Sequence, residues 1–228
     1  MNFVFKLNDY PSVPISGIAD RFPVRRVYCV GQNYINHAIE MGVQKNRIQP
    51  FFFNKPADAL CYGCNRIPYP SATKDFQHEI ELVVAIGKKG KKIRELESLE
   101  YVFGYAVGLD LTRRDLQIVA KKNRQPWTTA KSFDFSAPCS KIHLASRVGY
   151  LDKGEITLTV NDKIRQKGDI SDMIWSVNEI ISILSFYFEL YPGDLIFTGT
   201  PEGVGQLKKG DKIIGEVENL DKLILEIF

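Results

Sequence analysis

Short apolar segments separated by glycine and proline run through most of this chain. The sequence has 17 glycines and 11 prolines in 228 residues, and its apolar runs, such as 51–53 and 82–86, are only a few residues long. Short segments between turn-forming residues are typical of β-strands. Because few stretches have helical spacing, we expect a mainly β fold with added α-helices, and not a repeating βαβ array.

The length of the chain suits a single domain. A chain of 228 residues can bury a full core, and this one shows no internal repeat, low-complexity tract or long Gly/Ser linker. Apolar residues make up 44% and charged residues 25%, which is ordinary for globular proteins and argues against disorder. We expect a short N-terminal lead-in over residues 1–22 and one domain over residues 23–228.

The net charge argues against two classes of partner. Thirty Lys and Arg stand against 27 Asp and Glu, which leaves a formal charge of +3. This excess is too small to indicate a nucleic acid or an anionic membrane surface. No apolar run reaches the roughly 18 residues needed to cross a bilayer. The first residues also lack the pattern of a secretory signal, so a cytoplasmic protein is expected.

Four cysteines lie at positions 29, 61, 64 and 139. Without a recognisable secretion signal, they are expected to be reduced. Cys61 and Cys64 have the spacing of half a zinc site, but no second pair of Cys or His follows at a suitable distance. The sequence therefore favours neither a zinc site nor redox chemistry.

Several elements can be placed from local patterns. Residues 26–30 predict a buried strand, and Asn33 can cap a helix that continues to residue 42. The clearest strand covers residues 79–86. Residues 156–166 predict a hairpin, because Asn-Asp at its centre favours a tight turn.

Two further helices have recognisable starts. Thr112 and Asp115 resemble a capping box and predict a helix that ends near Asn123. Ser176 and Glu179 form a fuller capping box before a run of apolar residues, which predicts a largely buried helix.

Two glutamates stand on the strand predicted over residues 79–86. Glu79 and Glu81 are two positions apart, so they point to the same face. Partly buried carboxylates repel each other unless a cation or proton lies between them, and Asp110, which ends another apolar segment, can supply a third ligand. Three oxygen ligands favour Mg²⁺ or Mn²⁺ over zinc. Alternatively, both glutamates line the solvent face of an edge strand, and the spacing does not decide between these readings.

Three other side chains are candidates for catalysis. His37 and Glu40 are three positions apart on the predicted helix, where the carboxylate could orient the imidazole for proton transfer. A solvated surface pair has the same spacing. Lys131 lies among small residues and could stabilise negative charge on a reacting oxygen, although a lone lysine is more commonly a surface residue.

Taken in order, these motifs resemble the fumarylacetoacetate hydrolase family, in particular its small single-domain branch of acylpyruvases and oxaloacetate decarboxylases. The resemblance covers the chain from about residue 24 to the C-terminus. The motifs that carry it are VGQNY at 30–34 with His37 and Glu40, NKP at 54–56, HEIEL at 78–82, DLTRRDLQ at 110–117, AKSFD at 130–134 and TGTPEGVG at 198–205.

The resemblance implies a mixed β-sheet roll of the type of the family's C-terminal domain, one Mg²⁺ or Mn²⁺ ion per subunit, and a homodimer. It implies three metal ligands, Glu79, Glu81 and Asp110. It implies a water-activating pair, His37 and Glu40, and an active-site lysine, Lys131. It implies substrate contacts by Asn33, Lys55, Arg114, Gln117 and Thr200. Gln32 stands where the family often has Arg, so that contact is not carried over.

The implied activity is metal-dependent hydrolysis of the C–C bond of an acylpyruvate, of the fumarylpyruvate or acetylpyruvate type, to pyruvate and a carboxylic acid. The presence of both His37 and Glu40 favours hydrolysis, because an attacking water must be activated. The alternatives are oxaloacetate decarboxylation or keto-enol tautomerisation, and isomerisation or decarboxylation of 2-hydroxyhepta-2,4-diene-1,7-dioate in aromatic catabolism. A metal-stabilised scaffold without turnover is the alternative from another class.

Overall fold

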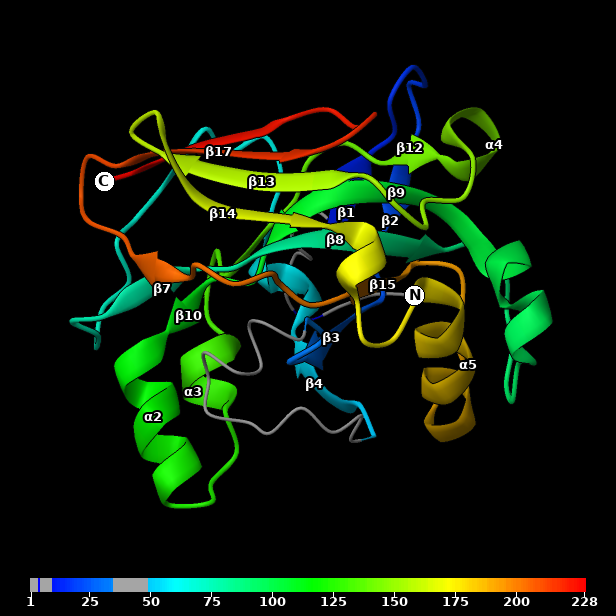
Figure 1. The fold of residues 1–228 in the computed structure, drawn as a ribbon, viewed down its shortest axis with the longest axis horizontal. Helices are drawn as coiled ribbons and strands as arrows, with labels where there is room; N and C mark the ends of the chain where they lie inside the picture. Colours follow the sequence, from blue (N-terminus) through cyan, green and yellow to red (C-terminus); the bar gives the residue numbers. More distant parts are fainter. Residues whose placement is uncertain (1–3, 5–9, 35–48) are drawn as a thin grey trace.

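The computed structural model describes Val4, residues 10–34 and residues 49–228. Within these ranges the chain forms many short strands and a few short helices (Figure 1), which confirms the expected mainly β fold. The helix predicted from Asn33 to residue 42 lies almost wholly outside the described residues. In the described part of the chain, no helix is long and apolar enough to cross a membrane.

A mixed six-stranded sheet forms the centre of the molecule, with the order β12-β9-β8-β15-β3-β4. Strands β15 and β3 are parallel, and the other neighbours are antiparallel. The expected buried strand over residues 26–30 is β3, and the strand expected over 79–86 is β8. The strands of this six-stranded sheet are β3 (Arg26–Gly31), β4 (Phe51–Lys55), β8 (Ile80–Ile86), β9 (Val102–Leu109), β12 (His143–Leu144) and β15 (Asp194–Phe197).

A five-stranded sheet with the order β14-β13-β17-β18-β6 lies over the β8–β9 part of the central sheet (Figure 1). The predicted hairpin is β13–β14, and its turn residues Asn161 and Asp162 have φ values of 51° and 62°, which Asn and Asp tolerate better than most residues. The strands are β6 (Arg66–Ile67), β13 (Glu155–Val160), β14 (Lys163–Asp169), β17 (Lys212–Val217) and β18 (Leu223–Ile227).

Three smaller sheets complete the β structure. The hairpin β1–β2 buries Val13 and Phe22 against the central sheet, so residues near the end of the expected lead-in contribute to the core. The strands are β1 (Ser12–Pro14), β2 (Arg21–Pro23), β5 (Leu60–Cys61), β7 (Phe76–His78), β10 (Thr112–Arg113), β11 (Ala137–Pro138) and β16 (Gly205–Gln206).

The helices are short. The helix predicted after Ser176 is α5, and its capping box is present, because the backbone N–H and the hydroxyl of Ser176 both donate to Glu179 Oε2, at 3.0 and 2.7 Å. The α-helices are α2 (Arg114–Lys122), α3 (Thr128–Lys131), α4 (Ala145–Val148) and α5 (Val177–Tyr187). The 3₁₀ helices are η1 (Ala57–Ala59), η2 (Glu95–Tyr101) and η3 (Ile170–Asp172).

Helix α2 has the predicted extent but not the predicted cap. Its N-cap residue is Arg113, whose side chain makes no capping hydrogen bond. The Thr112 hydroxyl instead donates to the carbonyl of Asp110 at 3.0 Å, and the Asp115 carboxylate accepts from the hydroxyl of Thr73 at 2.6 Å and the backbone N–H of Lys74 at 2.8 Å. The expected capping box is therefore wrong, because Thr112 bonds to a neighbouring carbonyl and Asp115 to a distant segment.

Strand β8 is buried on both faces. Leu82 and Val84 face a core shared with the five-stranded sheet, whereas Val83 and Ala85 face a second core shared with the β1–β2 hairpin. Glu81 lies on the same face as Val83 by strand alternation and is only 2% exposed. The alternative in which these glutamates line the solvent face of an edge strand is therefore excluded.

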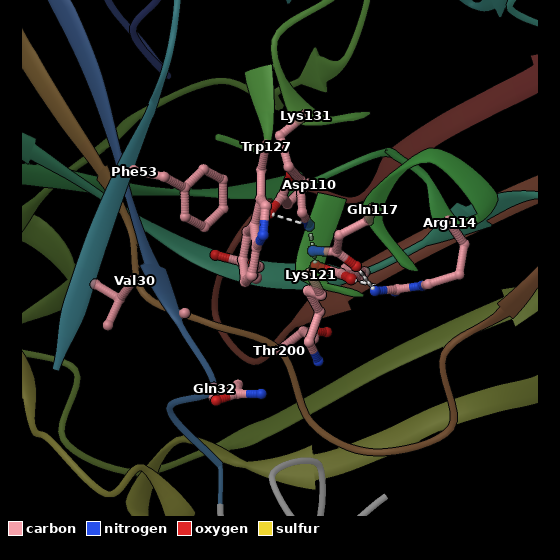
Figure 2. Close-up of a pocket in the computed structure, with 13 residues that line it drawn as sticks. Val30, Gln32, Phe53, Asp110, Arg114, Gln117, Lys121, Trp127, Lys131 and Thr200 are labelled. Atoms are coloured by element: carbon pink, nitrogen blue, oxygen red, sulfur yellow. Dashed lines mark hydrogen bonds and ion pairs between the residues drawn. The ribbon is translucent and has the colours of Figure 1, made fainter. Parts of the chain in front are cut away.

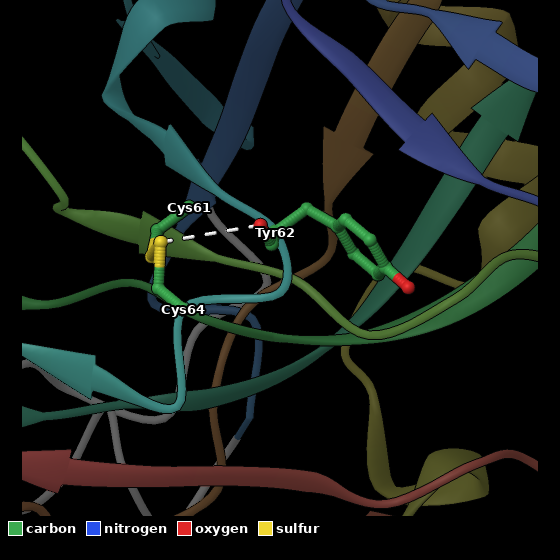
Figure 3. Close-up of a disulfide and its surroundings, with 3 residues drawn as sticks. All are labelled: Cys61, Tyr62 and Cys64. Atoms are coloured by element: carbon green, nitrogen blue, oxygen red, sulfur yellow. Dashed lines mark hydrogen bonds between the residues drawn. A yellow bond between two sulfur atoms is a disulfide. The ribbon is translucent and has the colours of Figure 1, made fainter.

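Two of the four cysteines differ from expectation. Cys61 and Cys64 form a disulfide across a tight turn, with Cα atoms 5.8 Å apart (Figure 3). Cys29 and Cys139 are free and buried. The expectation of reduced cysteines is therefore wrong for this pair. The turn at Gly63, with φ of +70°, brings the two Cα atoms within bridging distance.

Candidate metal centre and active-site pocket

Three buried carboxylates converge at one end of strands β8 and β9. One oxygen each of Glu79, Glu81 and Asp110 lies within 4.8 Å of the others. The antiparallel register sets Ile80 opposite Leu109, and the backbone N–H of Asp110 donates to the carbonyl of Glu79 at 2.8 Å. Strand pairing thus holds together carboxylates that are about thirty positions apart in the sequence.

The three carboxylates form a site that suits a hard divalent cation. Burial and the negative charges of Asp110 and Glu79 raise the pKa of Glu81 well above its usual range, although the backbone N–H of Gly199 donates to Glu81 Oε2 at 2.8 Å. A cation between the carboxylates would offset this repulsion. Because every donor atom is a carboxylate oxygen, the set fits Mg²⁺ or Mn²⁺.

Lys131 is buried beside the carboxylates and is not a surface residue. Its Nζ donates to Glu79 Oε2 and Asp110 Oδ2, both at 2.7 Å, and to the hydroxyl of Thr112 at 2.6 Å. Burial by itself lowers the pKa of Lys131, but the carboxylates of Asp110 and Glu79 outweigh it and raise the pKa above the usual value. Lys131 is therefore a protonated hydrogen-bond donor in this site.

Helix α2 directs two polar side chains at the same centre. The Arg114 guanidinium contacts a carboxylate oxygen of Glu79 and the amide oxygen of Gln117, and its Nε donates to Gln77 Oε1 at 2.8 Å. Since Gln117 accepts from Arg114 through its oxygen, the amide nitrogen is the group that it can offer as a donor.

A buried glutamine determines the hydrogen-bonding role of Thr200. Gln166 Oε1 accepts from the backbone N–H of Ile80 at 3.1 Å, and Gln166 Nε2 donates to the hydroxyl of Thr200 and to the carbonyl of Pro201, both at 2.8 Å. The Thr200 oxygen is therefore an acceptor toward Gln166, and its hydroxyl proton remains for donation into the pocket. Sequence reasoning did not identify Gln166, because only the pairing of distant strands brings it here.

The three carboxylates line a pocket with about 360 Å³ of empty space, part of it open to solvent, together with Lys131, Arg114, Gln117 and Thr200. Figure 2 shows Phe53 and Trp127 on one side of it, and their ring centroids are 5.8 Å apart. This aromatic wall gives an apolar surface beside the charged groups. Six lining residues were not predicted to take part in the site, namely Val30, Gly31, Gln32, Phe53, Lys121 and Trp127. Helical periodicity could have identified Lys121, which lies one turn after Gln117.

Two predicted substrate contacts, Asn33 and Lys55, do not line this pocket. The amide of Asn33 donates to the carbonyls of Thr198 and Trp175, at 2.8 and 2.9 Å, and accepts from the N–H of Trp175 at 2.8 Å. Lys55 Nζ lies 2.8 Å from Asp110 Oδ1 and donates to the carbonyl of Leu111 at 3.2 Å. Both side chains thus stabilise the backbone and side chains around the site without lining the pocket itself. His37 and Glu40 lie outside the described residues.

Replacing Asn33 by Ala is expected to destabilise the protein by ~3 kcal/mol, because three hydrogen bonds to the backbone are lost at a buried position. Denaturant unfolding measures the change. Asn65→Ala is the control, since Asn65 is exposed. Equal stability of the two variants would contradict this bracing role.

Comparisons with known proteins agree on one family. Residues 26–227 match the family model described as fumarylacetoacetate (FAA) hydrolase C-terminal. The crystal structure of fumarylpyruvate hydrolase from Pseudomonas aeruginosa in complex with Mn²⁺ and pyruvate superposes with a TM-score of 0.97, at 47% identity over 99% of each chain.

Two curated relatives carry different names. Fumarylpyruvate hydrolase of a Ralstonia species is 44% identical over 81% of this chain and 96% of that protein. The human mitochondrial oxaloacetate tautomerase FAHD1 is 38% identical over 89% of this chain and 91% of that protein. The relatives are therefore enzymes that act on small oxo acids.

Proposed function

The chain belongs to the fumarylacetoacetate hydrolase family, and from this membership we propose that it is an acylpyruvate hydrolase that uses Mg²⁺ or Mn²⁺. The observation that carries the proposal is the convergence of Glu79, Glu81 and Asp110 within 4.8 Å beside the buried Lys131. The similar Pseudomonas aeruginosa fumarylpyruvate hydrolase, which holds Mn²⁺ and pyruvate, supports both the metal and the pyruvyl part of the substrate.

In this proposal Glu79, Glu81 and Asp110 would hold the cation. When bound, Mg²⁺ or Mn²⁺ supplies a Lewis acid that polarises the 2-oxo acid end of the substrate. Lys131, protonated and fixed by two carboxylates, stabilises negative charge that develops on the substrate oxygens. Its buried position keeps this charge effect strong, because little water screens it.

The neighbouring polar groups orient the substrate. Thr200 donates its hydroxyl proton to a substrate oxygen, and the amide nitrogen of Gln117 donates to another. Arg114 holds Gln117 and Glu79 in position for these contacts. The aromatic side chains of Phe53 and Trp127 cover the acyl chain.

The overall reaction consumes one water. Its hydroxyl adds to the acyl carbon, the bond between that carbon and the methylene group breaks, and the methylene carbon takes up a proton to become the methyl group of pyruvate. His37 removes the water's proton, and Glu40 orients its imidazole. This assignment concerns residues outside the described ranges and rests on the motif in the sequence.

Replacing His37 by Ala is expected to lower the rate of acylpyruvate hydrolysis by roughly 10²- to 10⁴-fold, because the attacking water loses its base. Mg²⁺ affinity is expected to stay nearly unchanged, because His37 is not a proposed ligand. Steady-state kinetics and calorimetric titration with Mg²⁺ test the two expectations. Turnover at the wild-type rate would remove His37 from the mechanism.

One substrate panel tests the proposed function. Fumarylpyruvate, acetylpyruvate and oxaloacetate are incubated with the Mg²⁺-loaded protein, and pyruvate release is followed, with EDTA-treated protein as the control. Metal-dependent cleavage of an acylpyruvate is the expected result. No activity on any of the three, with metal bound, would overturn the proposal in favour of a scaffold.

Oxaloacetate chemistry is the second candidate, and the similarity to oxaloacetate tautomerase FAHD1 favours it. Neither decarboxylation nor tautomerisation requires an attacking water, so both would survive the loss of His37. Loss of the oxaloacetate enol signal together with absence of acylpyruvate cleavage would favour this candidate. The dienedioate isomerase alternative is tested by the same approach with its own substrate.

We further propose that the enzyme works as a homodimer. Three consecutive aromatic residues at the end of α5, Phe186, Tyr187 and Phe188, are between 37% and 63% exposed and offer an apolar surface to a second copy. Sedimentation equilibrium measures the mass in solution, and a monomer at micromolar concentration would contradict the proposal. The cytoplasmic location and a role in aromatic catabolism stay predictions.

A further inference from the structure

One cation in the pocket has no part in the chemistry described above. Lys121 lines the pocket but makes no contact with the carboxylates of Glu79, Glu81 or Asp110. In the described part of the chain, no carboxylate forms an ion pair with it. Lys121 is exposed at the pocket, where a ligand can reach its ammonium group.

The position of Lys121 on α2 directs it to the same side as the substrate-orienting residues. Lys121 follows Gln117 by four positions and Arg114 by seven, so the three share one face of the helix. Figure 2 shows Lys121 between Gln117 and Thr200. Its Cα lies about 10 Å along the helix axis from that of Arg114, so Lys121 approaches the pocket from farther along α2 than the residue that contacts Glu79.

The charges of the pocket leave an excess of positive charge at this end. Three carboxylates and three cations line the described pocket, and their formal charges cancel. A divalent ion at Glu79, Glu81 and Asp110 therefore makes the loaded pocket doubly positive, and Lys55 behind Asp110 adds to this excess. An acylpyruvate with one carboxylate neutralises only one of the two excess positive charges. An acylpyruvate with a second, distal carboxylate neutralises both.

The surroundings of Lys121 indicate an anion subsite. Burial, followed by the nearby Arg114 guanidinium, lowers the pKa of Lys121, so two cationic groups lie close together. Arg114 is compensated by the carboxylate of Glu79, whereas Lys121 has no such partner among the described residues. A carboxylate on the ligand would supply the missing counter-charge.

We propose that Lys121 binds the distal carboxylate of a dianionic substrate, so that the enzyme acts on acylpyruvates whose acyl group ends in a carboxylate. The inference rests on the proposed acylpyruvate function and deepens it by naming the substrate class. Fumarylpyruvate is of this class, and acetylpyruvate is not. The aromatic wall of Phe53 and Trp127 would cover the apolar chain between the two carboxylates.

Binding of two probes that cannot be cleaved tests the proposal without turnover. The probes are 2-oxoheptanedioate and 2-oxoheptanoate, which match in chain length and differ in the distal carboxylate. Calorimetric titration of the Mg²⁺-loaded protein is expected to show about tenfold tighter binding of the dioate, the effect of one charge-assisted hydrogen bond at a partly exposed site. Lys121→Met is expected to remove this preference by weakening only the dioate, and Lys121→Arg to restore most of it.

Lys122→Met is the matched control. Lys122 is the next residue on α2, is exposed and points about 100° away, so this variant carries the same change in net charge without lining the pocket. It is expected to keep the wild-type preference. Equal binding of the two probes by the wild type, or equal losses in the Lys121→Met and Lys122→Met variants, would overturn the inference.

Turnover separates this inference from the proposed function. The ratio of kcat/KM for fumarylpyruvate over acetylpyruvate is expected to fall about tenfold in Lys121→Met, mainly through KM. If no acylpyruvate is cleaved but the preference for the dioate depends on Lys121, the hydrolase proposal fails and the anion subsite stands. If acylpyruvates are cleaved and the dioate is not preferred, the hydrolase proposal stands and the anion subsite at Lys121 is overturned.

Discussion

Replacing Glu81 by glutamine is expected to weaken Mn²⁺ binding by on the order of 10²-fold or more and to reduce hydrolysis in proportion. The amide offers a neutral oxygen and an NH₂ group that repels a cation, while the shape of the side chain is kept. Glutamine can still accept from the N–H of Gly199. Calorimetric titration with Mn²⁺ measures the loss.

The same substitution is expected to leave the metal-free protein at least as stable as the wild type. Glu81 is buried among the like charges of Asp110 and Glu79, which raise its pKa, so a neutral group in its place relieves repulsion. Thermal melting in EDTA tests this expectation. A large loss of metal-free stability would show that Glu81 has a structural role instead of serving as a ligand.

Added metal distinguishes the variant further. The wild type at 100 times the Kd for Mn²⁺ gains about 2.7 kcal/mol of stability, which corresponds to a rise in Tm of roughly 5–10 °C. Glu81→Gln is expected to lose this rise. Glu100→Gln is the control, because Glu100 is exposed and its one ion pair among the described residues is with Lys88, at 3.7 Å. This variant is expected to keep the rise.

Replacing Lys131 by Met is expected to destabilise the metal-free protein by about 3–5 kcal/mol, because buried Glu79 and Asp110 lose the cation that compensates them. The loss is expected to be smaller with Mn²⁺, because a bound cation compensates the same carboxylates. Turnover at saturating Mn²⁺ is expected to fall by on the order of 10²- to 10³-fold. Urea unfolding with and without Mn²⁺, and kcat, are the measurements.

Lys209→Met controls for the loss of a lysine. Lys209 is exposed, so its replacement is expected to change stability by less than about 0.5 kcal/mol. If the two variants had equal stability, Lys131 would not be the counter-charge of the carboxylate cluster. If Lys131→Met kept full turnover, its proposed role in stabilising charge on the substrate would be wrong.

Much of the fold could be predicted from local patterns. The apolar segment of β8, the Asn161–Asp162 turn and the capping box at Ser176 all depend on residues close in the sequence, and the structure confirms them. The capping box at Thr112 failed for a complementary reason. The hydroxyl of Thr112 donates to the carbonyl of Asp110 and accepts from Lys131. Lys131 is 19 positions away, and no local pattern reveals this contact.

By itself, the sequence determined which residue types could form the site and which face each one occupies. The two-residue spacing of Glu79 and Glu81 places both on one side of a strand whatever the rest of the chain does. The pattern of alternation also made metal ligation by these residues and Asp110 a specific hypothesis. Only the tertiary structure decided whether that face is buried, because this depends on the sheets and hairpin that pack against β8.

The tertiary structure also decided which groups meet across the pocket. Pairing of β8 with β9 brought Asp110 to Glu79, and packing of α2 brought Lys121 toward Thr200, while Asn33 turned to the backbone behind the site. Periodicity specifies a direction on one element, but the distance between elements depends on strand register and on packing between distant segments. For that reason the three carboxylates could be selected from the sequence as proposed ligands, whereas the arrangement of the other side chains around the pocket could not.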